Sequence, residues 1–389
     1  MSKKANANLH KAKANKKDEF YTRLGDIENE LKYYKEHFKD KVVYCNCDDP
    51  LASNFFVYFF MNFKHLGLKE LITACYKSMN FKELSKEDSP KKAYAIRIHK
   101  SSGVNPQIHS LKDIEELLEL SLSNGEKQSE KTLKQFEANK HKLEQCFVGL
   151  KPDKIKLETL FEDEEKDNAG DFRSKDCIEL LKEADIVVTN PPFSLFREYV
   201  SQLVEYKKKF VIIGNQNAIT YKEIFKYIKN NELWLGRTLS YAAFKVPIYY
   251  EERSNRFWID ENGQKWRSFG NICWFTNLEI KKRSEILETI YTYEKYKDKY
   301  PKYDNYDAIN VDKTNEIPID YKGVMGVPIT FLDKHNPKQF EIVGLDNHLI
   351  NNGLGAGCNS INGKKIYRRL IIRQIATVKE LKKQREEKL

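Results

Sequence analysis

The stretch that decides the fold reads Asp185-Ile-Val-Val-Thr-Asn-Pro-Pro-Phe-Ser-Leu-Phe196. Residues 186–188 are a β-branched run typical of a strand buried on both faces, and the two prolines end it because neither can donate to a sheet ladder. The Asn190-Pro191-Pro192-Phe193 loop must therefore leave the sheet edge. Ser194 can cap a helix over 196–204, where apolar residues recur at helical spacing. This order predicts an α/β fold with a ligand at the carboxyl end of the strand.

The Asn190 loop carries two acceptors suited to an amino group, the Asn190 side-chain oxygen and the Pro191 carbonyl. The loop resembles the signature of amino-methyltransferases, which move the methyl of S-adenosylmethionine onto an exocyclic or amide nitrogen. Two acceptors hold both amino hydrogens and aim the nitrogen lone pair at the methyl carbon, and Phe193 stacks on the base. A simple turn with Phe193 in the core is the alternative reading of the same residues.

Composition is consistent with a large protein that has a polyanionic partner. The chain has 389 residues and a formal net charge of +10, which favours nucleic acid as a partner. Its seven cysteines form no Cys-x-x-Cys pair, which argues against a zinc site and a disulfide scaffold. No apolar run reaches the roughly 20 residues needed to span a bilayer, and the lysine-rich N-terminus lacks an apolar signal region. We expect a cytoplasmic protein with no metal and no membrane partner.

The N-terminal part is expected to begin with a flexible basic arm over residues 1–17, which contacts phosphate or solvent. A helix from about Asp26 to Phe38 follows. The first buried strand is in Lys41-Val-Val-Tyr-Cys-Asn-Cys-Asp-Asp-Pro50, and the turn after it contains no glycine, so the generic glycine-rich cofactor motif is absent.

This region resembles the EcoRI-type DNA adenine-N6 methyltransferase family, in which Asn-Cys-Asp-Asp-Pro followed by Ser-Asn-Phe-Phe occupies the same place. The pattern recurs in the run from Asp26, in Gly170-Asp-Phe-Arg173, in the Asn190 loop, and in Tyr303–Asn310 with Gly323–Leu332. These matches keep their order and cover most of residues 10 to 345. The resemblance implies a set of cofactor-binding residues: Phe20, Tyr21, Thr22, Asn46, Asp48, Asp49, Pro50, Asp171 and Phe172.

Within that set, the resemblance implies that Asp171 accepts from the adenine amino group of the cofactor. Asp171 precedes a short helix, Ser174 to Glu183, and a role as a turn cap is its alternative. Further buried strands are expected at 71–74 and 210–214, with a helix over 221–230. Residues 233–236 and 272–276 are expected to form the antiparallel hairpin that closes the sheet.

Two stretches differ in composition from this core. Residues of about 80–163 suggest an inserted helical hairpin, with helices over 111–122 and 133–147 around an Asn124-Gly125 turn. Residues 241–267 interleave aromatic rings with arginines, which suits phosphates and unstacked bases. Phe244 is the candidate second ring on an extruded adenine, with Arg253 and Arg256 as DNA contacts. Cross-strand aromatics of an ordinary β-hairpin are the alternative.

The C-terminal part resembles the target-recognition region of the family. Base-edge readout needs Asn, Arg and Lys side chains, and Asn305, Asn310 and Lys313 are the candidates. A basic helix from about Tyr367 to Lys388 is expected to contact phosphate or solvent.

The sequence thus predicts a Rossmann-like S-adenosylmethionine-dependent methyltransferase sheet over 18–280 with an inserted helical hairpin, and a DNA-recognition region over 281–389. The resemblance implies methyl transfer to a flipped adenine in duplex DNA, at GAATTC or a related AATT-core palindrome. A restriction endonuclease recognising the same site is a candidate partner. Methylation of RNA or of a protein glutamine amide, and a non-catalytic DNA-binding module, are the alternatives.

Overall fold

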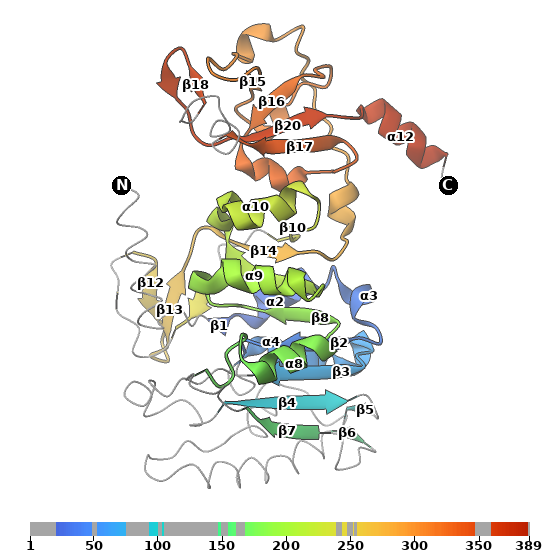
Figure 1. Cartoon of the computed structure of the whole chain (residues 1–389), viewed down its shortest axis with the longest axis vertical. Helices are drawn as coiled ribbons and strands as arrows, with labels where there is room; N and C mark the ends of the chain where they lie inside the picture. The colour runs from blue at the N-terminus through green and yellow to red at the C-terminus, as the bar shows by residue number, and fades with distance from the viewer. Residues whose placement is uncertain are drawn as a thin grey trace. The chain divides into compact units, whose positions relative to one another are not determined.

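The computed structural model describes residues 21–48, 53–74, 93–99, 103–104, 147–148, 155–160, 168–238, 243–246, 252, 255–346 and 359–387. The chain divides into two compact units (Figure 1). The first unit comprises Met1–Ala218 with Thr238–Leu278, and the second comprises Ile219–Arg237 with Glu279–Leu389. The chain therefore leaves the first unit after Ala218, returns to it at Thr238 and leaves it again after Leu278.

The first unit is built on a sheet whose centre is parallel, as Figure 1 shows. The adjacent strands β9, β8, β2 and β3 run in the same direction, and β14, β4 and β7 extend the sheet antiparallel at its two sides. The bounds are β2 Val42–Cys45, β3 Glu70–Ala74, β4 Tyr94–His99, β7 Ile155–Thr159, β8 Ile186–Thr189, β9 Lys209–Asn215 and β14 Ile272–Thr276. Every residue of β2, β3 and β8 is buried, as expected for parallel strands that are covered on both faces.

Two helices of this unit, α4 and α8, begin at a capping hydroxyl. Ser53 accepts from the Phe55 amide before α4, and Ser174 accepts from the Cys177 amide before α8, which satisfies an otherwise unpaired first-turn donor. The bounds are α2 Leu24–Leu31, α3 Lys35–Phe38, α4 Asn54–Met61, α5 Phe63–Leu66, α8 Lys175–Glu183 and α9 Phe196–Glu205. The predicted single helix from Asp26 to Phe38 is two helices.

A smaller antiparallel sheet also belongs to the first unit, in the order β1-β11-β13-β12. Its strands are β1 Tyr21–Thr22, β11 Ala243–Lys245, β12 Phe257–Ile259 and β13 Lys265–Ser268. Trp258 faces Trp266 across β12 and β13, with ring centroids 6.4 Å apart and planes at 9°. For these two rings the cross-strand alternative is therefore confirmed.

The expected insertion contains strands that the sequence reading missed. β4 and β7 lie within residues 80–163 and belong to the main sheet, while β5 Gly103–Val104 pairs with β6 Phe147–Val148. Phe147, expected in a helix, is thus in a strand. The remainder of the two expected helices lies outside the described residues, as does the 1–17 arm.

The second unit has its own sheet, in the order β15-β16-β20-β17. Its elements are α10 Lys222–Lys229, β10 Trp234–Leu235, η5 Lys281–Ser284, η6 Lys297–Lys299, β15 Ile309–Asn310, η7 Thr314–Glu316, β16 Val324–Val327, η8 Ile329–Lys334, β17 Phe340–Leu345, β18 Ser360–Ile361, β19 Lys364–Lys365, β20 Leu370–Gln374 and α12 Val378–Glu386. The prediction of a helix from Tyr367 was wrong, because β20 pairs on both sides, with β16 and β17. The helix begins only after Thr377, which forms a capping box with Glu380.

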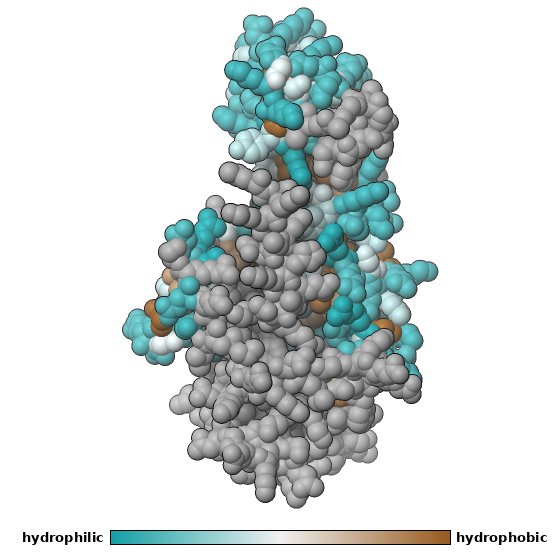
Figure 2. Space-filling model, turned by 60° about the vertical axis from the view of Figure 1, so that its left-hand side comes forward, coloured by the Kyte–Doolittle hydropathy of each residue, from teal (hydrophilic) through white to brown (hydrophobic). Residues whose placement is uncertain are grey.

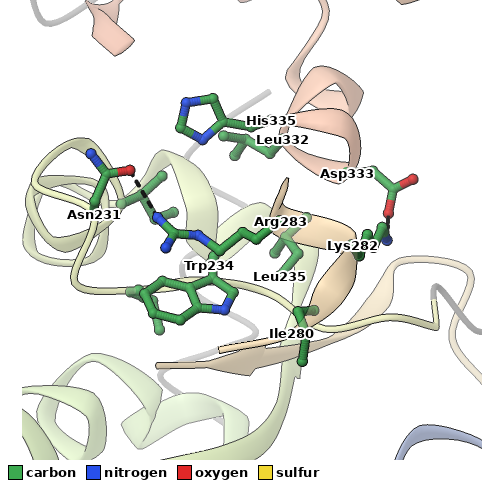
Figure 3. A pocket seen from close by; sticks show the side chains of 11 residues that line it. Asn231, Trp234, Leu235, Ile280, Lys282, Arg283, Leu332, Asp333 and His335 are labelled. Carbon is green, nitrogen blue, oxygen red and sulfur yellow. Dashed lines mark hydrogen bonds and ion pairs between the residues drawn. The ribbon is translucent and has the colours of Figure 1, made fainter. Parts of the chain in front are cut away.

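A pocket in the second unit is lined by side chains that bind one another (Figure 3). The Arg283 guanidinium lies over the Trp234 ring at 3.7 Å and donates to the Asn231 side chain at 2.9 Å, while Lys282 is paired with Asp333. His335 also lines the pocket, and its Nε2 forms a hydrogen bond with the Phe340 carbonyl at 2.9 Å. These contacts join residues 228–235 to residues 280–335 inside the unit.

Candidate active site

Polar residues of the first unit converge where the adjacent parallel strands β2 and β8 end. Asp48 follows β2 and is 8% exposed. Its carboxylate accepts from the Thr189 hydroxyl at the end of β8 and, at 2.7 Å, from the Ser53 hydroxyl that caps α4. Charged acceptors make strong hydrogen bonds, so Asp48 fastens two strand ends and a helix start together.

Asn46 lies two residues before Asp48 in the sequence and is 1% exposed. Its Oδ1 accepts from the hydroxyl of Tyr199 on α9, while its Nδ2 is buried and has no hydrogen-bond partner among the described residues. The same holds for Oγ1 of Thr22, whose backbone carbonyl accepts from Asn54 Nδ2 at 2.6 Å. Burying an unsatisfied polar atom costs roughly 1–3 kcal/mol, so both atoms are suited to a polar ligand.

The Asn190 loop stands beside these residues at the same sheet edge. Asn190 is half-buried, its Oδ1 is inaccessible to solvent, and Pro191 is buried. The loop continues into a 3-10 turn, η3 Phe193–Leu195, and α9 starts at Phe196 with Leu195 at its N-cap and no side-chain cap. The prediction that Ser194 caps the helix was therefore wrong, since the turn continues directly into α9.

Three aromatic rings pack against one another at the loop, and one of them is the loop residue Phe193. Phe193 lies edge-on to Phe244 and Phe269, with centroid distances of 6.4 and 6.3 Å, and Phe244 and Phe269 are 5.8 Å apart. Phe244 is 0% exposed, so in this conformation it supports Phe193 and has no face free for a base. Phe269 is half-buried and was missed, because nothing in the sequence distinguished it from the other aromatics nearby.

Asp171 approaches the same region from the loop before α8. It is 7% exposed, and Arg173 binds its two oxygens at 2.8 and 2.7 Å. The hydrogen bonds that Arg173 donates to Asp171 raise the pKa of the Arg173 guanidinium, so Arg173 stays charged. Each carboxylate oxygen has two lone pairs, which leaves Oδ2 able to accept once more. Phe172 packs edge-on against Tyr199 at 5.0 Å.

The thiols near these residues are protonated. Burial and, after it, the Asp48 charge raise the pKa values of Cys45 and Cys47 well above their ordinary value. Because the thiolate is the reactive form of cysteine, these side chains present neutral surfaces to the site. No group of three or more His, Cys, Asp or Glu side chains that could hold a metal occurs among the described residues.

The remaining predicted site residues are scattered. Phe20, Asp49, Pro50 and Arg253 lie outside the described residues. Tyr21 pairs with Lys245 between β1 and β11, and Arg256 is exposed with a φ of +56°.

The three candidate base-reading residues lie in the second unit. The Lys313 side chain is 71% exposed. Asn305 Oδ1 accepts from the Ser360 amide at 3.3 Å. Asn310 is 3% exposed, and its Oδ1 accepts from Tyr303 and Arg369 while its Nδ2 donates to Asp312. Asn305 and Asn310 thus have structural contacts in this conformation.

A search of the described residues finds no helix long and apolar enough to cross a membrane.

Comparison with known proteins places this chain beside DNA-modifying enzymes along nearly its whole length. The family described as "Adenine-specific methyltransferase EcoRI" matches residues 8–388. The type II methyltransferase M.EcoRI of Escherichia coli is 46% identical over 367 residues, which are 94% of this chain and 95% of the relative. M.MgeORF184P of Mycoplasma genitalium is 34% identical and M.MpnI of Mycoplasma pneumoniae is 33% identical, each over 94% of this chain and 98% of the relative. No solved structure matches the chain.

Proposed function

Since the chain belongs to the EcoRI family of adenine-specific DNA methyltransferases, we propose that methyl transfer to adenine N6 takes place at the Asn190 loop, on a base flipped out of duplex DNA. The observation that supports this most is the convergence of Asn46, Asp48, Thr189 and Asn190 at the carboxyl ends of two adjacent parallel strands. Ligands of open α/β sheets bind at this edge. On the same ground we propose that the first-unit sheet is a Rossmann-like methyltransferase sheet.

The loop residues act on the amino group of the target adenine. The N6 lone pair is delocalised into the ring, so the nitrogen is a poor nucleophile until both hydrogens are held. Asn190 Oδ1 and the Pro191 carbonyl accept those hydrogens, localise the lone pair and orient it. Phe193 contacts one face of the base. Phe269, half-buried and 6.3 Å from Phe193, replaces Phe244 as our candidate for a second ring contact.

S-adenosylmethionine, when bound, supplies the electrophilic methyl group. The residues present fit it, because Asn46 Nδ2 and Thr22 Oγ1 are buried polar atoms that lack partners among the described residues and Asp171 Oδ2 retains acceptor capacity. We propose that Asn46 and Thr22 bind the polar methionine end and that Asp171 accepts from the adenine amino group of the cofactor, with Phe172 as its apolar neighbour. Asp48 fixes the strand ends that carry these groups.

The substrate is proposed to be duplex DNA at GAATTC or a related AATT-core palindrome, because the chain shares 46% identity with M.EcoRI. Flipping is needed because the amino group of a stacked base cannot reach a half-buried loop. The second unit, close in extent to residues 281–389, is the proposed target-recognition region. A restriction endonuclease with the same target is a proposed partner.

The test is transfer of labelled methyl from S-adenosylmethionine to unmethylated duplex DNA, with the modified base identified and its flanks mapped. We expect N6-methyladenine at one short palindrome. Incorporation into RNA or protein in preference to duplex DNA would overturn the substrate assignment. A folded protein that binds DNA without any incorporation would overturn the catalytic one.

A further inference from the structure

A short β-hairpin stands out from the second unit. Its strands are β18 and β19, and they pair Ser360 with Lys365 and Ile361 with Lys364. The two turn residues, Asn362 and Gly363, have φ values of +50° and +72°. Positive φ at both central positions marks the type I′ turn, whose twist matches that of the flanking strands, and Asn-Gly is its preferred dipeptide. The hairpin is therefore locally well specified.

The segment that starts at Tyr303 holds this turn in place. The Asp304 carboxylate accepts from the backbone amides of Asn362 and Gly363 at 3.0 and 2.9 Å, and the Asp304 amide donates to the Ser360 carbonyl at 2.9 Å. These amides lower the pKa of Asp304, with the Gly363 amide as the largest cause. Asn305 accepts from the Ser360 amide on the same strand. Isolated two-stranded hairpins are marginal in water, and these bonds supply the support that this one needs.

Asn310 fixes the segment that follows the hairpin. Its Oδ1 accepts from Arg369 Nε at 3.1 Å, and the Arg369 guanidinium also lies 3.4 Å from Asp312. Arg369 is thereby neutralised and leads into the buried strand β20. Of the two asparagines predicted to read bases, Asn305 thus binds the first residue of the hairpin and Asn310 binds the residue that follows Arg368.

Between these anchors the hairpin displays cations. Lys364, Lys365 and Arg368 are exposed, and Tyr367 is 90% exposed. Across the described part of the chain, no carboxylate pairs with any of these three cations. Figure 2 shows the described residues of the second unit as a mostly hydrophilic surface on the face in view. Exposed cations that served only solubility would not need a hairpin whose backbone is held by side-chain hydrogen bonds.

We propose that the hairpin over residues 360–368 contacts duplex DNA, with Lys364, Lys365 and Arg368 on phosphates. This rests on the proposed DNA substrate and names the surface of the second unit that contacts it. A two-stranded ribbon fits the major groove, and lysine and arginine contacts to phosphate set position on the duplex and supply affinity. Tyr367 lies against the sugar-phosphate backbone. Asp304, Asn305 and Asn310 act as positioning residues through the hairpin.

The experiment measures duplex affinity against salt for wild type and the double variant Lys364→Ala/Lys365→Ala. Each phosphate contact contributes about 0.9 to the slope of log affinity against log salt. Loss of two contacts should lower the slope by nearly 2 and weaken binding by about tenfold or more at about 50 mM salt. The ratio of the duplex affinity of wild type to that of the double variant should shrink by about tenfold on going to about 200 mM salt.

The matched control is Lys39→Ala/Lys69→Ala, which removes two exposed lysines just before β2 and β3, at the amino ends of these strands. It should keep the wild-type slope. S-adenosylmethionine binding should match wild type in both double variants, and methyl transfer should match wild type in the control.

An unchanged slope and affinity in Lys364→Ala/Lys365→Ala, while wild type methylates and binds the same duplex, would overturn the hairpin assignment alone. If wild type itself neither binds nor methylates duplex DNA, the proposed function fails. An equal loss of slope in the control would mean that the effect is net charge, which would also overturn the assignment.

Discussion

The strand-end site of the first unit and the hairpin of the second unit use polar residues in opposite ways. Asn46 and Asp48 are 1% and 8% exposed and bind side chains from distant parts of the chain. Lys364 and Lys365 are exposed, and it is the backbone beneath them that is held. A group that must hold one atom of a ligand in place needs a dry, fixed position. A group that neutralises phosphate needs reach and exposure.

Rigidity is supplied differently in the two regions. In the first unit, buried side-chain hydrogen bonds fix the Asn46 and Asp48 side chains themselves. In the second, Asp304 fixes a turn and leaves the charged tips free. Substitutions in the first region should therefore change chemistry or stability, and substitutions in the second should change affinity for DNA.

The largest effect should come from Asn190→Ala, which removes one of the two proposed acceptors. Losing an interaction made mainly in the transition state lowers kcat by at least about 1,000-fold, or roughly 4 kcal/mol. S-adenosylmethionine affinity by calorimetry should stay within a few-fold. Asn190→Asp keeps an acceptor oxygen and should retain more activity. Full turnover by the alanine variant would remove Asn190 from the chemistry.

The next largest effect is expected for Phe244→Ala. This variant shows whether the Phe244 ring stabilises the fold or contacts the target base. Phe244 is 0% exposed, so Phe244→Ala should lower the free energy of unfolding by about 4 kcal/mol. Phe269→Ala, in a half-buried ring, should cost less stability and more methyl transfer. Denaturant unfolding and single-turnover rates check both. A reversed order would reassign base contact to Phe244.

Asp48→Ala should open the junction of the two strand ends. Two hydroxyl donors, on Ser53 and Thr189, lose a charged acceptor, so the unfolding free energy should fall by roughly 3 kcal/mol. Cofactor binding should weaken with it, because the strand ends carry the proposed ligands. Asp48→Asn keeps the shape and should lose less. Wild-type stability in the alanine variant would contradict the fastening role of Asp48.

The smallest of these effects is the pH dependence of stability that His335 gives the second unit. Burial, opposed by the bond to Phe340 and aided by Arg283, lowers the pKa of His335 from 6.5 to about 4. The unfolded chain therefore takes up this proton at higher pH than the folded one. The stability given by neutral His335 is full above pH 6.5 and is lost as pH falls toward about 4.

In numbers, the loss between neutral pH and about pH 5 is roughly 2 kcal/mol. Urea unfolding at a series of pH values measures it. His335→Gln, which cannot titrate, should flatten the curve over this range. The same pH slope in both proteins would show that other groups cause it.

The sheet of the first unit could be predicted where apolar runs were continuous. Strands β2, β3, β8, β9 and β14 and helix α10 lie where the sequence indicated. β4 and β7 were missed because they reach the sheet through a long insertion whose composition resembled helices. β20 was missed because its basic neighbours favoured a helix, while pairing on both sides decided for a strand.

In the candidate sites, too, local sequence signals could be read, whereas contacts between distant parts of the chain could not. Asn190 stood out because it directly follows a buried strand, and Asp48 was implied by the family resemblance of the segment after the first strand. Their connection through Thr189 crosses 141 residues and could not be read from local sequence. Asn362-Gly363 beside two lysines was a readable turn signal, whereas its attachment to Asp304 depends on tertiary contacts. Asn305 and Asn310 were recognised by residue type, and only the structure shows that they bind the hairpin and the residue after it, Arg369.

The measurement that tests the division between the two regions most directly is a paired determination of single-turnover methyl transfer at saturating duplex and of duplex affinity at low salt. It compares Asn190→Ala with Lys364→Ala/Lys365→Ala. We expect the first variant to bind duplex and fail to transfer methyl, and the second to transfer methyl once saturated with duplex and to bind weakly at lower duplex concentration. The reverse pattern, or loss of both properties in both variants, would contradict this expectation.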